Sequence, residues 1–256
     1  ISAPRCFEIE KRLKEKLDIP VFHDDQHGTA IVASAAMMNA AKVAEKKISD
    51  MTLVINGAGA AGIAIAKQFI SLGIGNIIMV DIEGIICDGD EFKNPAHYEI
   101  AKLTNKNHIK GTLADAMKGA DAFIGVSRPD LVTAEMIKSM AEKPIIFAMA
   151  NPKPEIMPDK ALEAGAFIVG TGRSDFPNQI NNVVAFPGIF KGALSVRASD
   201  INEEMKLAAA YAIAATVPDE ELRPDNILPN SFDRKIPVAV AAAVAEAAEK
   251  SGVARI

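Results

Sequence analysis

The sequence contains only two cysteines, Cys6 and Cys87, which lie far apart and show no CxxC spacing. Such sparse cysteine argues against a zinc ribbon and fits a reducing compartment, so we expect a cytoplasmic protein. No apolar run approaches the roughly 20 residues needed to cross a bilayer, so we expect no membrane partner. The chain also does not open with a charged, then apolar, then small-residue leader, so nothing in it predicts secretion.

Clusters of positive charge are also absent. The 28 lysines and arginines are outnumbered by 33 aspartates and glutamates, which gives a formal net charge of −5. A protein that grips a phosphate backbone needs a basic patch, so we expect no nucleic-acid partner. At 256 residues, of which 49% are hydrophobic, the chain is long enough to bury a large core.

Short apolar runs alternate with helical stretches along the chain. An amphipathic helix is expected over about 4–17, and a small-residue helix from Gly28 to about 46. The alternation predicts an α/β fold with a doubly wound, Rossmann-like parallel sheet, followed by an Ala-rich helical segment from Ser199 that is interrupted at 218–237. Strands are expected at 52–56, 76–81, 121–127, 144–151 and 166–172, and further helices at about 63–73, 112–119, 133–142 and 158–164.

The motif GAGAAG at 57–62 follows an expected strand and opens an expected helix. Gly57 would allow a tight turn, Gly59 the close approach of a pyrophosphate, and Gly62 close packing of the helix on the strand. Asp81 ends the next strand about 20 residues later, where a dinucleotide site places an acid that accepts the ribose hydroxyls. An ordinary turn with a surface acid is the alternative, but the order of strand, turn, helix and acid favours a dinucleotide site.

Asp81 also bears on the choice between NAD and NADP. The 2′-phosphate of NADP would place negative charge beside this carboxylate, and the residues that follow add acids but no basic residue before Lys93. The sequence therefore favours NAD over NADP.

The stretch VFHDDQHGTA at 21–30 places two acids, Asp24 and Asp25, between His23 and His27. The histidine spacing copies a helical zinc motif, but the nearby proline and glycine argue against a helix at this point. One acid could instead cap the helix that follows. The pair could also bind Mg²⁺ or Mn²⁺ through its carboxylate oxygens. Spacing alone leaves capping and metal binding open.

Several longer motifs carry a resemblance to a known family. They are DIPVFHDDQHGTAIV, VINGAGAAGIAIAKQ, FAMANPKPEIMP, GTGRSDFPNQINNVVAFPG and GALSVRASDINEEMKLAAAYAIA. Through them the chain resembles the bacterial malic enzymes over practically its whole length. The resemblance implies oxidative decarboxylation of L-malate to pyruvate and CO₂, with reduction of NAD, a required Mg²⁺ or Mn²⁺ ion, and a homodimer.

The resemblance also implies roles for single residues. Asp25 would bind the metal directly, and Asp24 would support the ligand shell and the proton network. Asn151 would lie at the nicotinamide and substrate end, and Asn182 would donate its side-chain amide to a malate carboxylate. Without the resemblance each asparagine fits a turn residue, and Arg173 fits a loop ion pair as well as a ligand contact. The pyrophosphate would be held by Gly57, Gly59, Ala60, Ala61 and Gly62, and the adenosine ribose by Asp81.

In this family an acidic pair that completes the metal site comes immediately before the segment corresponding to Ile1, and a catalytic tyrosine and lysine lie in a preceding N-terminal domain. We therefore expect residues 1–27 to be a lead-in helix and metal-ligand loop that end the substrate and metal domain. Residues 28–198 would form the NAD-binding domain and 199–256 the C-terminal helices that pack on it. The N-terminal domain of the same polypeptide would supply the rest of the site, so the chain alone should bind NAD but turn malate over poorly.

Three other functions stay open at this point. One is a malolactic-type conversion of malate to lactate without release of NADH. Another is a non-catalytic NAD-binding module, and the third is oxidation of a different 2-hydroxy acid.

Overall fold

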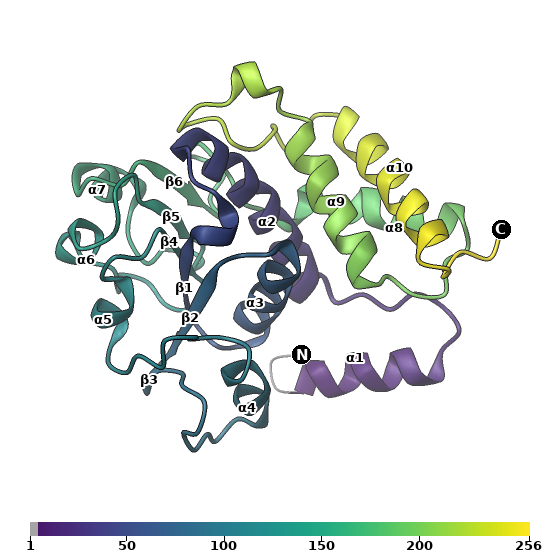
Figure 1. Cartoon of the computed structure of the whole chain (residues 1–256). Coiled ribbons are helices and arrows are strands. Elements are labelled where there is room, and N and C mark those ends of the chain that lie inside the picture. Colours follow the sequence, from purple (N-terminus) through teal and green to yellow (C-terminus); the bar gives the residue numbers. More distant parts are fainter. Residues whose placement is uncertain (1–4) are drawn as a thin grey trace.

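The computed structural model describes residues 5–256. Its centre is a six-stranded sheet in the order β3-β2-β1-β4-β5-β6, with helices on both faces (Figure 1). All neighbouring strands are parallel except β2 and β3. The predicted doubly wound, Rossmann-like sheet is thus confirmed. The strands are β1 (Thr52–Asn56), β2 (Asn76–Asp81), β3 (Gly84–Ile85), β4 (Ala122–Gly125), β5 (Ile145–Ala148) and β6 (Ile168–Thr171).

The helices follow the predicted order with two additions, α4 and α8. Helix α8 begins with a proline in its first turn and contains two glycines, which hide it from a propensity argument. The α-helices are α1 (Arg5–Lys16), α2 (Asp24–Ala44), α3 (Ala60–Leu72), α4 (Pro95–Ala101), α5 (Leu113–Met117), α6 (Ala134–Lys138), α7 (Pro158–Glu163), α8 (Phe186–Ser195), α9 (Glu203–Ala215) and α10 (Lys235–Lys250), with short 3₁₀ helices η1 (Ile48–Asp50), η2 (Asn182–Val184) and η3 (Asp219–Glu221).

Alternate side chains of each strand enter two separate cores. In β1, Leu53 and Ile55 belong to the core formed with α2 and α3, while Val54 belongs to the core on the other face, formed with α5, α6 and α7. Figure 1 shows these helices on opposite sides of the sheet. Because both faces are covered, the strands need apolar residues at successive positions, as the sequence has them.

Helix α2 is buried along most of its length, and many of its own side chains are small. A helix that is apolar on all sides belongs inside a protein, and alanines let α3 and α9 approach it closely. Among its buried polar residues, Asn39 donates hydrogen bonds of 3.0 Å to the carbonyl oxygens of Ala214 and Ile227. Asn39 therefore fastens α9 and the segment after it to the core.

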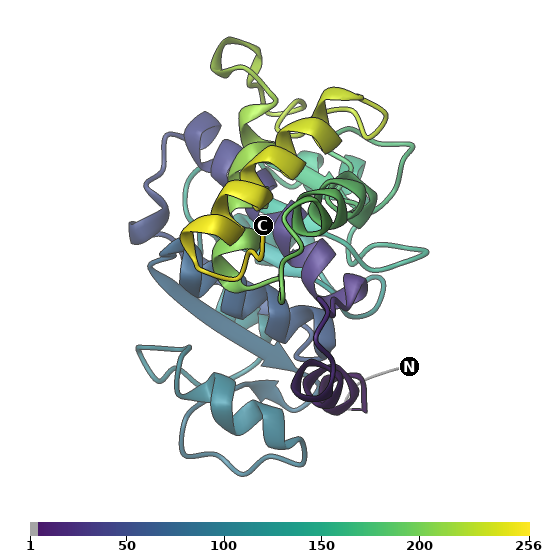
Figure 2. The same cartoon turned by 90° about the vertical axis from the view of Figure 1, so that its right-hand side faces the viewer.

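Helices α8, α9 and α10 add a further layer on the side of α2. Figure 2 shows α10, in yellow, across the outside of this layer. A side chain at Gly192 of α8 would meet Val244 of α10 at 2.8 Å, so the two helices can pack only with glycine there. The division of the chain at 27/28 and 198/199 stays a prediction, although α2 runs continuously through positions 27 and 28.

Helix α1 lies at the edge of the molecule and has one buried residue, Cys6 (Figure 1). Phe7 packs against the core on the side of α2 and α3. Two ion pairs also join α1 to the body: Glu10 pairs with His27 of α2, and Lys14 with Asp200. Within residues 5–256, no helix has the length and apolarity required to cross a membrane.

Candidate functional site

The predicted cofactor residues lie where the parallel strands end. Gly57 follows β1, Asp81 is the last residue of β2, and Asn151 follows β5. The carboxyl ends of parallel strands share one edge of a sheet, and this edge is where open α/β sheets bind ligands. The topology therefore brings residues that are almost 100 positions apart to one edge.

The three glycines of the turn differ in what their missing side chains permit. Gly57 has φ +111°, a conformation that side chains rarely adopt, and a Cβ at Gly62 would overlap the carbonyl oxygen of Gly57. Both are required by the fold itself. A Cβ at Gly59 would meet no atom of the described residues within 4 Å. Gly59 is the N-cap of α3, which begins with Ala60 and Ala61. Open space therefore lies in front of the backbone N–H groups of the first turn, which have no partner within the helix. This space fits a pyrophosphate.

A cavity of about 390 Å³ adjoins this turn. Its lining includes Gly57, Asp81, Ser127 and Arg128. The carboxylate of Asp81 is thus placed beside the glycine turn, as a ribose-binding acid would have to be. Arg128 brings a cation into the same lining. No local pattern in the sequence points to it, because it follows β4, far from Asp81.

His97 of α4 is a buried neighbour of this cavity that sequence reasoning missed. Its Nε2 lies 2.9 Å from the carbonyl oxygen of Ala58 and 3.8 Å from the carboxylate of Asp81. A carbonyl oxygen only accepts hydrogen bonds, so Nε2 carries the proton. His97 therefore holds the glycine turn next to the carboxylate that the sequence assigns to the ribose.

Asn151 is exposed and lies beside the end of β6, where a Cβ at Gly172 would come within 3.2 Å of its Nδ2. Arg173, which the sequence left open, forms an ion pair with Asp175 and lies 3.4 Å from the carbonyl oxygen of Pro152. The loop ion pair that the sequence left open for Arg173 is thus present in the structure.

The two acids of the opening motif occupy the first turn of α2. Asp24 accepts a hydrogen bond from the side-chain amide of Asn182, and its other oxygen, Oδ1, is buried with no hydrogen-bond partner among residues 5–256. A side chain at Gly28 would overlap Asp24 and approach Asn182 to 2.9 Å. Asp25 is exposed. The structure therefore brings Asp24 and Asn182 together and leaves the carboxylate of Asp25 accessible.

Burial raises the pKa of Asp24, and the charge of Asp25 raises it further, while the Asn182 amide and His23 oppose the change. A half-buried carboxylate with one unpaired oxygen, next to a second acid, is unfavourable unless a proton or cation neutralises it. The donor set is made of carboxylate oxygens, which suit a hard cation such as Mg²⁺ or Mn²⁺. The residues present fit such an ion.

The structure corrects two local expectations. Helix α2 begins at Asp24 rather than at 28, because His23 adopts the extended N-cap conformation and Gly28 lies inside the helix. Neither acid is the N-cap, so the capping alternative is wrong. The zinc alternative also fails, since Nε2 of His27 lies 2.7 Å from Glu10 and Nδ1 lies 3.2 Å from Lys206.

The lysine donates to Nδ1, so the other nitrogen of His27 carries the proton and donates to Glu10. Burial is the largest effect that lowers the pKa of His27 and keeps this ring neutral.

Across residues 5–256, no group of three or more His, Cys, Asp or Glu side chains is arranged to hold a metal ion. Asp24 and Asp25 can therefore supply only part of a metal site.

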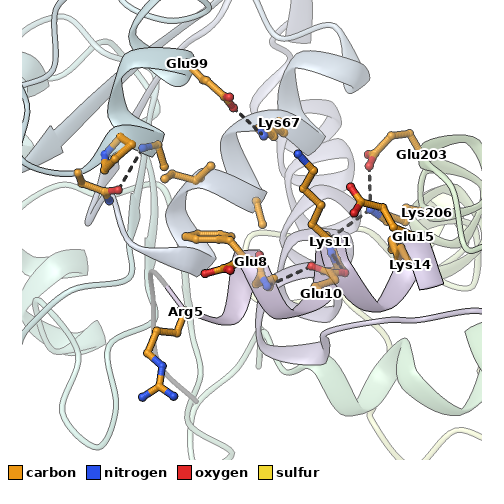
Figure 3. A pocket seen from close by; sticks show the side chains of 18 residues that line it. Arg5, Glu8, Glu10, Lys11, Lys14, Glu15, Lys67, Glu99, Glu203 and Lys206 are labelled. Atoms are coloured by element: carbon orange, nitrogen blue, oxygen red, sulfur yellow. Dashed lines mark hydrogen bonds and ion pairs between the residues drawn. The ribbon is translucent and has the colours of Figure 1, made fainter. Parts of the chain in front are cut away.

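A larger cavity, of about 860 Å³, lies between α1 and the helices α3, α4 and α9 (Figure 3). Two ion pairs lie within its lining: Lys67 pairs with Glu99, and the buried Lys206 with Glu203. None of the predicted site residues lines it. Size alone therefore does not mark the functional site of this chain.

Comparison with known proteins places these observations in a family. Residues 26–249 match the family described as "Malic enzyme, NAD binding domain". The bifunctional malic/malolactic enzyme of Bacillus subtilis (strain 168) is 57% identical over 257 residues, which cover 100% of this chain and 63% of that protein. The NAD-dependent malic enzyme of Geobacillus stearothermophilus is 56% identical and is covered to 53% of its length.

A solved structure agrees with this comparison. The crystal structure of the NAD-dependent malic enzyme from Thermotoga maritima matches 96% of this chain with a TM-score of 0.92 and 52% identity, and 64% of that chain is covered. Other similar proteins are named NADP-dependent malic enzymes. The chain thus spans less than two thirds of the length of these relatives.

Proposed function

Because the chain belongs to the malic enzyme family, we propose that it forms the NAD-binding and metal-contributing part of an enzyme that converts L-malate to pyruvate and CO₂. The contact of Asp24 with Asn182 carries the proposal. It joins the acidic pair to the segment after β6, within a fold whose sheet edge also holds the glycine turn.

In this proposal the dinucleotide lies across the carboxyl edge of the sheet. Gly59, Ala60 and Ala61 present the helix N-terminus to the pyrophosphate, while Gly57 and Gly62 shape the turn. Asp81 accepts the adenosine ribose hydroxyls and disfavours a 2′-phosphate, so NAD is the expected cofactor. Asn151 lies toward the nicotinamide end.

The metal and malate would lie at the start of α2. Asp25 is accessible and would bind Mg²⁺ or Mn²⁺ directly, with Asp24 supporting it. Asn182 has two amide protons. One is used by Asp24, and the second would donate to a malate carboxylate. Asn182 would thus fix the orientation of both Asp24 and the substrate.

Malate can chelate a cation through its C1 carboxylate and C2 hydroxyl, which fixes C2 for hydride transfer. When bound, NAD would supply the hydride acceptor, and a cation held by Asp25 would supply a Lewis acid for the oxygen on C2. The raised pKa of Asp24 suits a group that holds or passes a proton in this network. Loss of CO₂ from the resulting β-keto acid needs no further redox step.

The remaining groups would come from elsewhere. The chain covers 53% and 63% of two relatives, and two carboxylates do not complete a metal site. We therefore place the other metal ligands and the general acid and base in an N-terminal domain of the same polypeptide. The proposal includes a cytoplasmic homodimer.

The test is calorimetric titration of the 256-residue chain with NAD, followed by assay with malate and Mn²⁺ at the absorbance band of NADH. We expect NAD binding without steady NADH production. Failure to bind NAD contradicts the proposed cofactor role, and NADH production at the usual pace of enzymes contradicts the proposed division of the site. Lactate formed without NADH would indicate the malolactic reaction.

The variant Asp25→Ala separates the enzyme from a non-catalytic module. In the enzyme, it abolishes the effect of Mn²⁺ on malate binding but leaves NAD binding intact. If the chain is a module that only senses NAD, then neither the wild type nor Asp25→Ala binds malate, and Mn²⁺ does not change this result.

A further inference from the structure

A fully buried carboxylate, that of Glu155, lies in the loop between β5 and α7 and takes no part in the function proposed above. Its surroundings are built around it. A Cβ at Gly125, the last residue of β4, would overlap the carboxyl group of Glu155. A glycine at this position is therefore what allows the carboxylate to approach the end of β4.

Each oxygen of this carboxylate holds a different loop. Oε1 accepts a hydrogen bond of 3.0 Å from the backbone N–H of Ser127, which follows β4. Oε2 accepts one of 3.1 Å from the N–H of Ala150, which follows β5. An ionised carboxylate is the side chain best suited to accept two N–H groups at once, because it has acceptor capacity on both oxygens and no donor.

The same chain of contacts continues to the first strand. The side-chain amide of Asn56, the last residue of β1, donates a hydrogen bond of 2.8 Å to the hydroxyl of Ser127. Asn56, Ser127 and Glu155 thus connect the ends of β1, β4 and β5 along the carboxyl edge of the sheet. Asn56 and Ser127 also line the 390 Å³ cavity beside Asp81.

The two loops held by Glu155 belong to different ends of the proposed cofactor site. Ser127 faces the cavity that would take the adenosine ribose, and Ala150 directly precedes Asn151, which is assigned to the nicotinamide end. We infer that Glu155 is a positioning residue for the dinucleotide: it holds the loops after β4 and β5 at the spacing that lets one NAD molecule reach both. This inference rests on the proposed cofactor site.

The variant Glu155→Gln tests the inference with little change in shape. Glutamine keeps one acceptor oxygen but turns an NH₂ group toward the second backbone N–H, so one loop loses its bond. We expect a roughly tenfold rise in the Kd for NAD, the effect of one lost hydrogen bond. Glu163→Gln, an exposed glutamate in α7, is the matched control and should leave the Kd unchanged.

Circular dichroism and thermal unfolding must show that Glu155→Gln is folded at the titration temperature. A folded variant with the Kd of the wild type would overturn the inference while leaving the proposed function intact. A wild-type chain that does not bind NAD would contradict both the inference and the proposed function. Failure of the inference alone is therefore distinguishable from failure of the proposed function.

A second measurement does not depend on the variant. Amide hydrogen exchange followed by NMR should show the N–H groups of Ser127 and Ala150 protected in the wild-type chain before NAD is added, although Ser127 is exposed. Fast exchange at either N–H group would mean that the carboxylate does not hold that loop. This result would contradict the inference even if Glu155→Gln does not fold.

Discussion

The side-chain amide of Asn182 donates a hydrogen bond to the carboxylate of Asp24, although 158 positions separate the two residues. The bond joins the first turn of α2 to the 3₁₀ helix η2, which follows the last strand of the sheet. Gly28 lies between the two groups with no side chain. Three residues from distant motifs therefore form one local structure.

Gly28 provides a test in which two effects have opposite signs. In the interior of an ordinary helix, Gly→Ala stabilises a protein by about 1 kcal/mol. In α2 the new methyl group would overlap Asp24 and lie 2.9 Å from the Cβ of Asn182. We expect Gly28→Ala to lower the free energy of unfolding by about 1–3 kcal/mol. Urea denaturation measures the free energy of unfolding. A stabilised variant would contradict the close approach of Asp24 and Asn182 to Gly28.

The parts of the fold that local pattern specifies were predictable. Strand β2 was expected at 76–81 and is Asn76–Asp81, because a buried parallel strand is a continuous apolar run with clear ends. The glycine turn was equally readable, since Gly57 and Gly62 are demanded by backbone geometry within six residues. Strand β3 was missed because two residues carry no periodicity.

The contacts that complete the site were not predictable, because they depend on how distant segments meet. Glu155 lies in the loop after β5, and nothing near it in the sequence indicates that its carboxylate reaches the loop after β4. His97 lies on α4, a helix of seven residues without a clear pattern. The start of α2 was placed four residues too late because Gly28 was interpreted as a helix breaker, whereas it allows the contact of Asp24 with Asn182.

The accessible acid of the pair should govern metal affinity. We expect Asp25→Asn to weaken Mn²⁺ binding by about tenfold or more, measured in the presence of NAD and malate, because the neutral amide is a poorer ligand for a hard cation. Electron paramagnetic resonance of free Mn²⁺ follows the titration. Glu204→Gln is the matched control, since Glu204 is also an exposed acid in the first turn of a helix, α9. An equal loss of Mn²⁺ affinity in both variants would mean that the affinity depends only on the net charge of the protein.

The carboxylate at the end of β2 should set the preference between NAD and NADP. We expect Asp81→Asn to raise the Kd for NAD by about tenfold and to narrow the preference over NADP, because it removes both the ribose acceptor and the repulsion of a 2′-phosphate. Calorimetric titration with each cofactor gives the two constants. Asp88→Asn changes an exposed acid nearby that does not line the cavity and should leave both constants unchanged. An unchanged ratio in Asp81→Asn would exclude this carboxylate as the discriminating group.

The buried carboxyl group of Glu155 should also leave a signature in the pH dependence of stability. Burial raises its pKa above the ordinary 4.5, more than the N–H donors of Ser127 and Ala150 lower it. The folded chain then binds more protons at this group than the unfolded chain, so its contribution to stability is fully present below pH 4.5 and falls as pH rises through the folded pKa.

The variant Glu155→Gln does not titrate at this position, and all other groups are shared with the wild type. The free energy of unfolding of the wild type, minus that of the variant, should therefore fall as the pH is raised from about 4 to 8. Urea denaturation at a series of pH values measures this difference. For the exposed Glu163→Gln the same difference should stay flat, because its carboxylate is hydrated in both states. A difference for Glu155→Gln that grows with pH would mean that the two N–H donors outweigh burial and lower the pKa of this carboxyl group.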